Sequence, residues 1–242
     1  MYEDYKGGRS KTPGEFKEQM PYIRELINAL GVQYYELDNY EADDIIGTLA
    51  NKVDKELFDV VVLSGDRDLT QLATEHVKVD ITVKGVSEIE SYTPAHVAEK
   101  YDGLTPLQII DMKGLAGDAS DNIPGVTKIG EKTAIKLLKE YGSVEGIYEH
   151  IDEMKKSKMK ENLINDREIA FLSKQLATID VDAPIEVDVD KLKYEGKDLE
   201  KLVPFYQEMN FNSFLEKLQI TAEPVEMEDI LFSVVEEVTE DM

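Results

Sequence analysis

The chain has 242 residues, of which 42% are hydrophobic and 32% are charged, so it can bury a substantial core and has the composition of a soluble globular protein. The absence of cysteine excludes disulfides and thiolate metal sites, and no stretch approaches the roughly 20 apolar residues of a membrane helix, so we expect a cytoplasmic protein with no membrane partner. The net charge of −24 argues at first against nucleic acid as a partner, but residues 221–242 hold eight acids and no base, and the bases elsewhere are clustered.

The first part of the chain is predicted to alternate helices and strands. A polar, basic segment, Tyr2–Thr12, precedes Thr12-Pro13-Gly14-Glu15, which is typical of a helix start, and Gly31 would end that helix. The pattern then predicts a strand at Val32–Leu37, a helix at Glu41–Lys52, a central buried strand at Phe58–Leu63, a short helix at Leu69–Ala73, and two strands at His76–Val83 and Val86–Tyr92. Such alternation favours a layered α/β fold with a parallel sheet.

After Thr93 the pattern is helical only. Thr93-Pro94 and Thr105-Pro106 each look like a helix start, and periodic helices are predicted at Gly130–Tyr141, Arg167–Ile179 and within Val203–Leu218. We therefore expect an α/β region at 1–92, a helical region at 93–220 and an acidic tail or linker at 221–242, in which Ile230–Val235 could begin a further strand.

Three groups of acidic residues lie at the ends of predicted elements. They are Glu41, Asp43 and Asp44 at a helix start, Asp66 and Asp68 after the central strand, and Asp118 and Asp121 in the loop Gly117–Asn122. Each group has an ordinary explanation, because acids favour the first turn of a helix and Asp with Gly is common in turns. Together, however, they can converge on one crevice, and Mg²⁺ or Mn²⁺ takes oxygen ligands. The pattern favours two cations about 4 Å apart that catalyse phosphoryl transfer.

A glycine-bounded segment at 125–136 predicts a second kind of phosphate contact. Glu131 separates Gly130 from Lys132, so the spacing of a Walker loop fails. What remains is a hairpin that leads into a helix, with backbone N–H groups and lysines able to face a phosphate. The candidate DNA-binding residues are Gly125, Val126, Lys128, Ile129, Gly130, Lys132, Thr133 and Lys136. The alternative is an ordinary loop followed by a solvated helix.

Five motifs in order resemble the 5′→3′ exonuclease domain of bacterial DNA polymerase I, in the flap endonuclease superfamily of structure-specific 5′-nucleases. They are Tyr5-Lys6-Gly7-Gly8-Arg9, Tyr40-Glu41-Ala42-Asp43-Asp44, Ser64-Gly65-Asp66-Arg67-Asp68, Gly117–Val126 and Ile129–Ala134. The resemblance covers residues 1 to about 218. It implies a parallel-sheet α/β nuclease core, resolvase-like and PIN-like, followed by an α-helical region with a helix-hairpin-helix element.

The same resemblance implies a role for each candidate residue. Glu41, Asp43 and Asp44 would belong mainly to a first metal site, Asp66, Asp68, Asp118 and Asp121 mainly to a second, and Lys6 and Arg9 would contact the scissile phosphate at the base of a helical arch. The implied reaction is metal-assisted hydrolysis near the 5′ end of a flap, nick or duplex, by a monomer, and the hairpin carbonyls could bind K⁺. A polymerase region is expected beyond the acidic tail.

One departure from the family concerns the start of the chain. The family begins with two strands that each end in an aspartate, and this chain starts after both. We therefore expect a truncated core that lacks about 60 to 70 residues. Such a core should expose an apolar sheet edge and bind metal more weakly.

Two other functions fit the same residues. In the first, the helical half grips duplex DNA and the incomplete metal centre is inactive, so the chain is a non-catalytic DNA-binding module. In the second, the chain is an acidic-site ribonuclease of similar architecture, although the hairpin argues against this. DNA binding without cleavage at any Mg²⁺ or Mn²⁺ concentration would favour the first, and cleavage of flapped DNA compared with single-stranded RNA tests the second.

Overall fold

The computed structural model describes residues 5–7, 12–85 and 87–218, and these fall into two compact units. The first unit consists of residues 1–13 and 35–192, and the second of residues 14–34 and 193–242. The expected division at residues 92 and 220 stays a prediction. Arg9, the acidic tail and Ile230–Val235 lie outside the described residues.

The first unit contains a small mixed sheet with strand order β1-β2-β3. Strand β1 (Val60–Ser64) pairs in parallel with β2 (Val77–Lys84), and β2 pairs antiparallel with β3 (Glu88–Tyr92). On β2 the alternating residues Val77, Val79 and Ile81 are almost fully buried, which is the pattern of a strand with one face on a core. The predicted parallel pair and the predicted ribbon are both confirmed.

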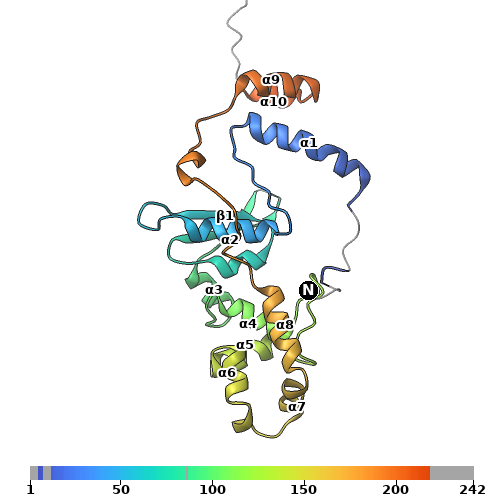
Figure 1. Cartoon of the computed structure of the whole chain (residues 1–242), viewed down its shortest axis with the longest axis vertical. Helices are drawn as coiled ribbons and strands as arrows, with labels where there is room; N and C mark the ends of the chain where they lie inside the picture. Colours follow the sequence, from blue (N-terminus) through green and yellow to red (C-terminus); the bar gives the residue numbers. More distant parts are fainter. Residues whose placement is uncertain (1–4, 8–11, 86, 219–242) are drawn as a thin grey trace, which may run out of the picture. The chain divides into compact units, whose positions relative to one another are not determined.

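Helices lie beside this sheet and continue away from it within the first unit (Figure 1). In chain order they are α2 (Ala42–Lys52), η1 (Arg67–Leu72), α3 (Pro94–Lys100), α4 (Gln108–Ala116), α5 (Glu131–Tyr141), α6 (Val144–Glu149), η2 (Ile151–Glu153), α7 (Lys158–Asn165), α8 (Arg167–Ala177) and η3 (Val189–Leu192). Helices α4 and α8 lie side by side (Figure 1). One continuous core joins the sheet residues Val62 and Val79 to Leu115 on α4 and Leu138 on α5. The fold class, an α/β core followed by a helical region, is therefore as predicted.

The second unit has a core of its own. It consists of α1 (Gly14–Ala29), α9 (Leu199–Glu208) and α10 (Asn212–Lys217). Ala29 on α1 packs in one cluster with Leu202, Phe205 and Tyr206 on α9. Gly31 has a φ of +73° and ends the helix that the sequence predicted.

Two predictions about strands are wrong. No strand forms at Val32–Leu37, where Val32 and Tyr34 are exposed, because an extended segment becomes a strand only when its backbone pairs with a neighbour. The expected central strand is β1, which lies at one edge of the described sheet, with Val61 and Leu63 58% and 61% exposed. An apolar run marks a strand but does not tell its place in the sheet.

The buried face of α2 also differs from the prediction. Ile45, Ile46 and Leu49 were expected to point inward, but Ile46 and Leu49 are only half-buried, whereas Gly47 and Thr48 are buried. The reason is a strap of residues 179–183 that packs along α2. The Thr48 hydroxyl donates to the carbonyl of Asp180 and accepts from the N–H of Ala183. A contact between segments more than 130 residues apart leaves no local trace in the sequence.

Candidate active site

The first group of acids sits at the start of α2, where helix capping fixes part of it. The N–H of Glu41 donates to Asp44 (3.0 Å), and the Glu41 side chain accepts from the backbone of Asp44 in return. The other oxygen of Asp44 accepts from the N–H of Asp180 (2.9 Å). The carboxylate of Asp44 thus caps α2 and holds the strap, which is the ordinary role of an acid in a first helical turn.

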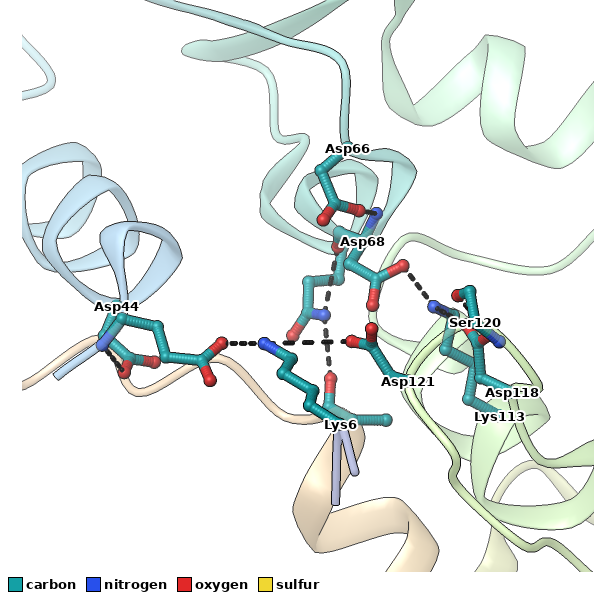
Figure 2. A network of polar contacts seen from close by, with 11 residues as sticks. Lys6, Asp44, Asp66, Asp68, Lys113, Asp118, Ser120 and Asp121 are labelled. Atoms are coloured by element: carbon teal, nitrogen blue, oxygen red, sulfur yellow. Dashed lines mark hydrogen bonds and ion pairs between the residues drawn. The ribbon is translucent and has the colours of Figure 1, made fainter. Parts of the chain in front are cut away.

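Lys6 lies between this helix start and the acid loop, which we define as residues 117–125. Its ammonium contacts the carboxylate of Glu41 and lies 3.8 Å from Asp121, and its N–H donates to the carbonyl of Asp121 (2.9 Å). Burial alone would lower the pKa of Lys6, but the hydrogen bonds to Glu41 and Tyr5 raise it. Figure 2 shows the ammonium of Lys6 pointing from its short segment toward the carboxylate of Asp121.

Asp66 and Asp68 follow β1, as the sequence predicted. Asp66 caps η1 by accepting from the N–H of Asp68 (3.0 Å), and the N–H of Asp66 donates to Ser64. Gln71, on the same short helix, is buried and donates to the carbonyls of Asp68 and Ala177 (3.0 Å each). These bonds attach the acidic turn, which we define as residues 66–68, to the end of α8.

The acid loop is closed at its neck by two glycines. A Cβ on Gly125 would lie 2.3 Å from the nitrogen of Gly117, and a Cβ on Gly117 would lie 2.6 Å from the carbonyl oxygen of Ile123. Gly117 has a φ of +73° and Gly125 a φ of +65°, in a region of backbone conformation that residues with side chains disfavour. Asp118 and Ile123 exchange two backbone hydrogen bonds across the loop (2.8 and 2.9 Å). The neck and this bridge position Asp118 and Asp121.

Lys113 joins the acidic turn to the acid loop. Its ammonium contacts Asp68 and lies 2.6 Å from Asp118, whose other oxygen accepts from the N–H and hydroxyl of Ser120. Burial alone would raise the pKa of Asp118, but the hydrogen bonds from Lys113 and Ser120 lower it to about 2. For Asp68 burial outweighs Lys113, so its pKa is raised.

The acids line two hollows, both within the first unit. The first hollow encloses about 850 Å³, and its charged lining residues are Lys6, Glu41, Asp43, Asp44, Asp68, Asp121 and Asp180. The second encloses about 550 Å³, and its acids are Asp66, Asp68, Asp118 and Glu131. Asp68 lines both. The structure thus brings the acidic groups to adjoining hollows but places Asp121 beside Lys6 and Glu41, whereas Asp66 and Asp118 lie around the second hollow.

The donors around these hollows suit a divalent cation. Their acidic lining residues present carboxylates, the hard oxygen ligands that Mg²⁺ takes. Burial and then the charges of Asp66, Glu41 and Asp68 raise the pKa of Asp43 to about 6, against the opposing effect of Lys6. Negative charge is therefore crowded there, and a cation would relieve it. Within residues 5–7, 12–85 and 87–218, no three acidic or histidine side chains lie close enough to hold one ion as they stand.

The predicted hairpin forms before α5, and its shape is fixed from outside. The N–H of Thr127 donates to Asp166 (2.8 Å), its carbonyl accepts from Asn162 (2.9 Å), and the N–H of Gly125 donates to Ser173 (3.0 Å). Lys128 has a φ of +62°. Val126 and Ile129 are buried, so their side chains serve the core, while Lys128, Lys132 and Lys136 are exposed and Thr133 is half-buried.

Sequence reasoning missed Lys113 and Gln71. Lys113 lies in the predicted helical region, in a chain with many solvated lysines, and only the fold places it against Asp68 and Asp118. Its position five residues before Asp118 was the one available signal.

In the part of the chain that the structure describes, no helix is long and apolar enough to cross a membrane.

Comparisons with known proteins give a consistent result. The sequence model of the 5′-3′ exonuclease N-terminal resolvase-like domain matches residues 1–102, and that of the 5′-3′ exonuclease C-terminal SAM fold matches residues 104–200. DNA polymerase I of Streptococcus pneumoniae (strain TIGR4) is 56% identical over 242 residues, and that of Bacillus subtilis is 54% identical over 245. These alignments cover the whole chain but only 27% and 28% of the relatives.

Solved structures share the fold. A T5 5′-exonuclease variant is 25% identical with a TM-score of 0.52, over 73% of this chain and 68% of that one. A bacteriophage T5 flap endonuclease, in a complex with DNA and metal ions, has a TM-score of 0.60 at 23% identity, over 87% and 77%. The catalytic core of Rad2 with a DNA substrate has a TM-score of 0.59 at 16% identity, over 88% and 71%.

Proposed function

Because this chain belongs to the 5′-3′ exonuclease family, we propose that it hydrolyses DNA phosphodiesters near the 5′ end of a flap, nick or duplex with two divalent cations. The observation that carries the proposal is the pair of adjoining hollows that share Asp68 and collect all three acidic groups. The metal-bound T5 enzyme and the DNA-bound T5 and Rad2 structures have the same fold.

Each cation is assigned a set of carboxylates. Glu41, Asp43 and Asp44 would hold the first cation, and Asp66, Asp68, Asp118 and Asp121 the second, although Asp121 lines the first hollow. Mg²⁺ is the proposed ion, with Mn²⁺ as a substitute, and when bound it supplies an activated water and charge stabilisation at the leaving oxygen. Since one oxygen of Asp44 already caps α2 and the other accepts from the N–H of Asp180, we expect Asp44 to orient the helix start more than it holds the ion.

Lys6 would act on the substrate phosphate. Its ammonium stands at the first hollow, where it can move from Glu41 to a phosphate oxygen and stabilise the charge that develops there. Arg9 is proposed for the same phosphate from the sequence motif alone.

The hairpin would bind the duplex without reading its sequence. Lys128, Lys132 and Lys136 are exposed beside it, and such lysines neutralise backbone phosphates. Its backbone, which Asp166 and Asn162 hold, would present N–H groups to a phosphate and carbonyl groups to a K⁺ ion. We propose a nuclease region at 1–92, a helical DNA-binding region at 93–220 and a linker beyond, in a monomer whose larger form carries a polymerase region.

A flap-cleavage assay tests the proposal. The 242-residue chain is incubated with a 5′-labelled flap and Mg²⁺, and the products are compared with those of the Asp66→Asn and Asp102→Asn variants. We expect Mg²⁺-dependent cleavage that Asp66→Asn abolishes and that Asp102→Asn leaves intact, because Asp102 lies outside both hollows and pairs with Lys139. Cleavage that survives in Asp66→Asn contradicts the assignment.

A second candidate is a DNA-binding module without catalysis. The observation that favours it is the lack, among the described residues, of three acids close enough to hold one ion. Flap binding with no cleavage at any Mg²⁺ or Mn²⁺ concentration would establish this module. Binding that requires the hairpin lysines is common to both functions, so cleavage alone separates them.

A further inference from the structure

A partly buried lysine, Lys113, lies between Asp68 and Asp118. Lys113 is 13% exposed, and its ammonium contacts Asp68 from one element and Asp118 from another (Figure 2). Neither carboxylate would keep this spacing without a cation between them, because like charges repel.

A second lysine of the same unit has the same chemistry at a different place. The ammonium of Lys174 lies 2.6 Å from Asp111 and 2.6 Å from Glu145, and it is also partly buried. Asp111 and Glu145 line neither hollow. Lys174 therefore has the same kind of double ion pair without any access to the proposed metal site.

The ammonium of Lys113 and a divalent cation would need the same oxygens. One oxygen of Asp118 accepts from Ser120 and the other from Lys113. One oxygen of Asp68 accepts from Lys113, and its second oxygen lies outside these bonds. A cation that binds both acids must share or displace the ammonium. A group that is bound to these carboxylates in the metal-free protein raises the concentration of cation at which the site is half-saturated.

We propose that Lys113 is a built-in counter-cation that holds Asp68 and Asp118 together in the metal-free protein and competes with Mg²⁺ for them. It acts as a positioning residue and sets the Mg²⁺ concentration at which the second hollow fills. The inference rests on the proposed function, since it takes Asp68 and Asp118 as ligands of a divalent cation.

The test measures Mg²⁺ binding rather than cleavage. Thermal unfolding and titration calorimetry of the full chain are followed against MgCl₂, with KCl adjusted to keep ionic strength constant. The variants are Lys113→Met and Lys113→Gln, which remove the charge, Lys113→Arg, which keeps it, and Lys174→Met as the matched control. Asp68→Asn identifies the part of the Mg²⁺ response that belongs to this hollow.

We expect both neutral variants to unfold at a lower temperature without Mg²⁺ and to reach half-saturation at a Mg²⁺ concentration at least about threefold lower than the wild type. Lys113→Arg should keep the wild-type value. Lys174→Met should also lose stability but leave the Mg²⁺ concentration at half-saturation unchanged. If Lys113 had a purely structural role, Lys113→Met would behave in the same way as Lys174→Met. If Lys113→Met does not fold, Lys113→Gln decides by the same criterion.

An unchanged or higher half-saturation in the neutral variants overturns the inference. The proposed function fails separately, when the wild type shows no Mg²⁺ response or when Asp68→Asn responds as the wild type does. A wild type that responds through Asp68, together with neutral variants that do not shift, contradicts the role of Lys113 alone.

Discussion

The acid hollows and the hairpin, which belong to the same unit, differ in how their charged side chains are held. In the hollows, charged side chains are partly buried and neutralise one another, with Lys6 between Glu41 and Asp121 and Lys113 between Asp68 and Asp118. At the hairpin the backbone is held rigidly and the lysines stay in solvent. The groups that we propose hold small cations are thus fixed by ion pairs, whereas the lysines that we propose contact DNA are exposed.

The largest effect should come from a hollow acid. Asp68→Asn removes the carboxylate that both hollows share, so we expect cleavage to fall on the order of 10³-fold or more while flap affinity changes little. Single-turnover cleavage and a filter-binding titration measure the two quantities. Equal losses of cleavage and affinity would show that the division between chemistry and grip is wrong.

A substitution at the neck should damage both regions at once. Gly125→Ala places a Cβ 2.3 Å from a backbone nitrogen at a φ of +65°, so we expect a loss of at least about 2 kcal/mol in the free energy of unfolding. Gly142→Ala is the control, because Gly142 also has positive φ but has open space where a Cβ would lie, and it should cost only about 1 kcal/mol. Urea unfolding measures both, and similar losses would refute the close-approach argument.

A hairpin lysine should affect binding alone. Lys132→Ala should weaken duplex binding several-fold for every sequence and reduce the slope of log K against log salt by about 0.9, with the rate of cleavage of bound DNA unchanged. Lys139→Ala serves as the control, because Lys139 pairs with Asp102 and stands further along α5. A sequence-dependent loss would indicate base contacts instead of phosphate contacts.

The smallest effect concerns the ion-pair cluster of Glu90, which lies 3.6 Å from Arg67 at the second hollow. Hydrogen bonds from Lys100 and then His96 lower the pKa of Glu90 to about 2, from an ordinary value of 4.5. A lowered folded pKa means that Glu90 adds stability above about pH 4.5 and loses that contribution as pH falls toward 2. Glu90→Gln should therefore lose a little stability at pH 7 and show a shallower decline between about pH 4.5 and 2 in thermal unfolding. An unchanged acid limb would show that solvent screens this cluster completely.

Local signals predicted most of the elements and the candidate residues. The alternation of Val77, Val79 and Ile81 gave β2, the apolar run gave β1, and the two glycines at 125 and 130 gave the hairpin before α5. These features depend on neighbours in the sequence. The acidic groups were found for the same reason, because each lies directly at the end of an element.

What the sequence did not predict depends on distant contacts. The strap along α2, the hydrogen bond of Gln71 to the end of α8 and the ion pair between Lys113 and Asp68 join segments 45 to more than 100 residues apart. The same limit explains why Asp121 was grouped with Asp118, its neighbour in the chain, although Lys6 and Glu41 stand beside it in the structure.

The neck of the acid loop fixes the distance between the hairpin and Asp118. Gly125 begins the hairpin and also lies against Gly117, where the acid loop begins, so the hairpin backbone and Asp118 share one anchored point. The backbone bridge between Asp118 and Ile123 leaves no slack between them. If the hairpin grips a duplex phosphate and the acids direct cleavage, the offset between the gripped and the cut phosphate is a fixed length. Lengthening the acid loop by a residue should then shift the cut site along the strand rather than slow the cut uniformly.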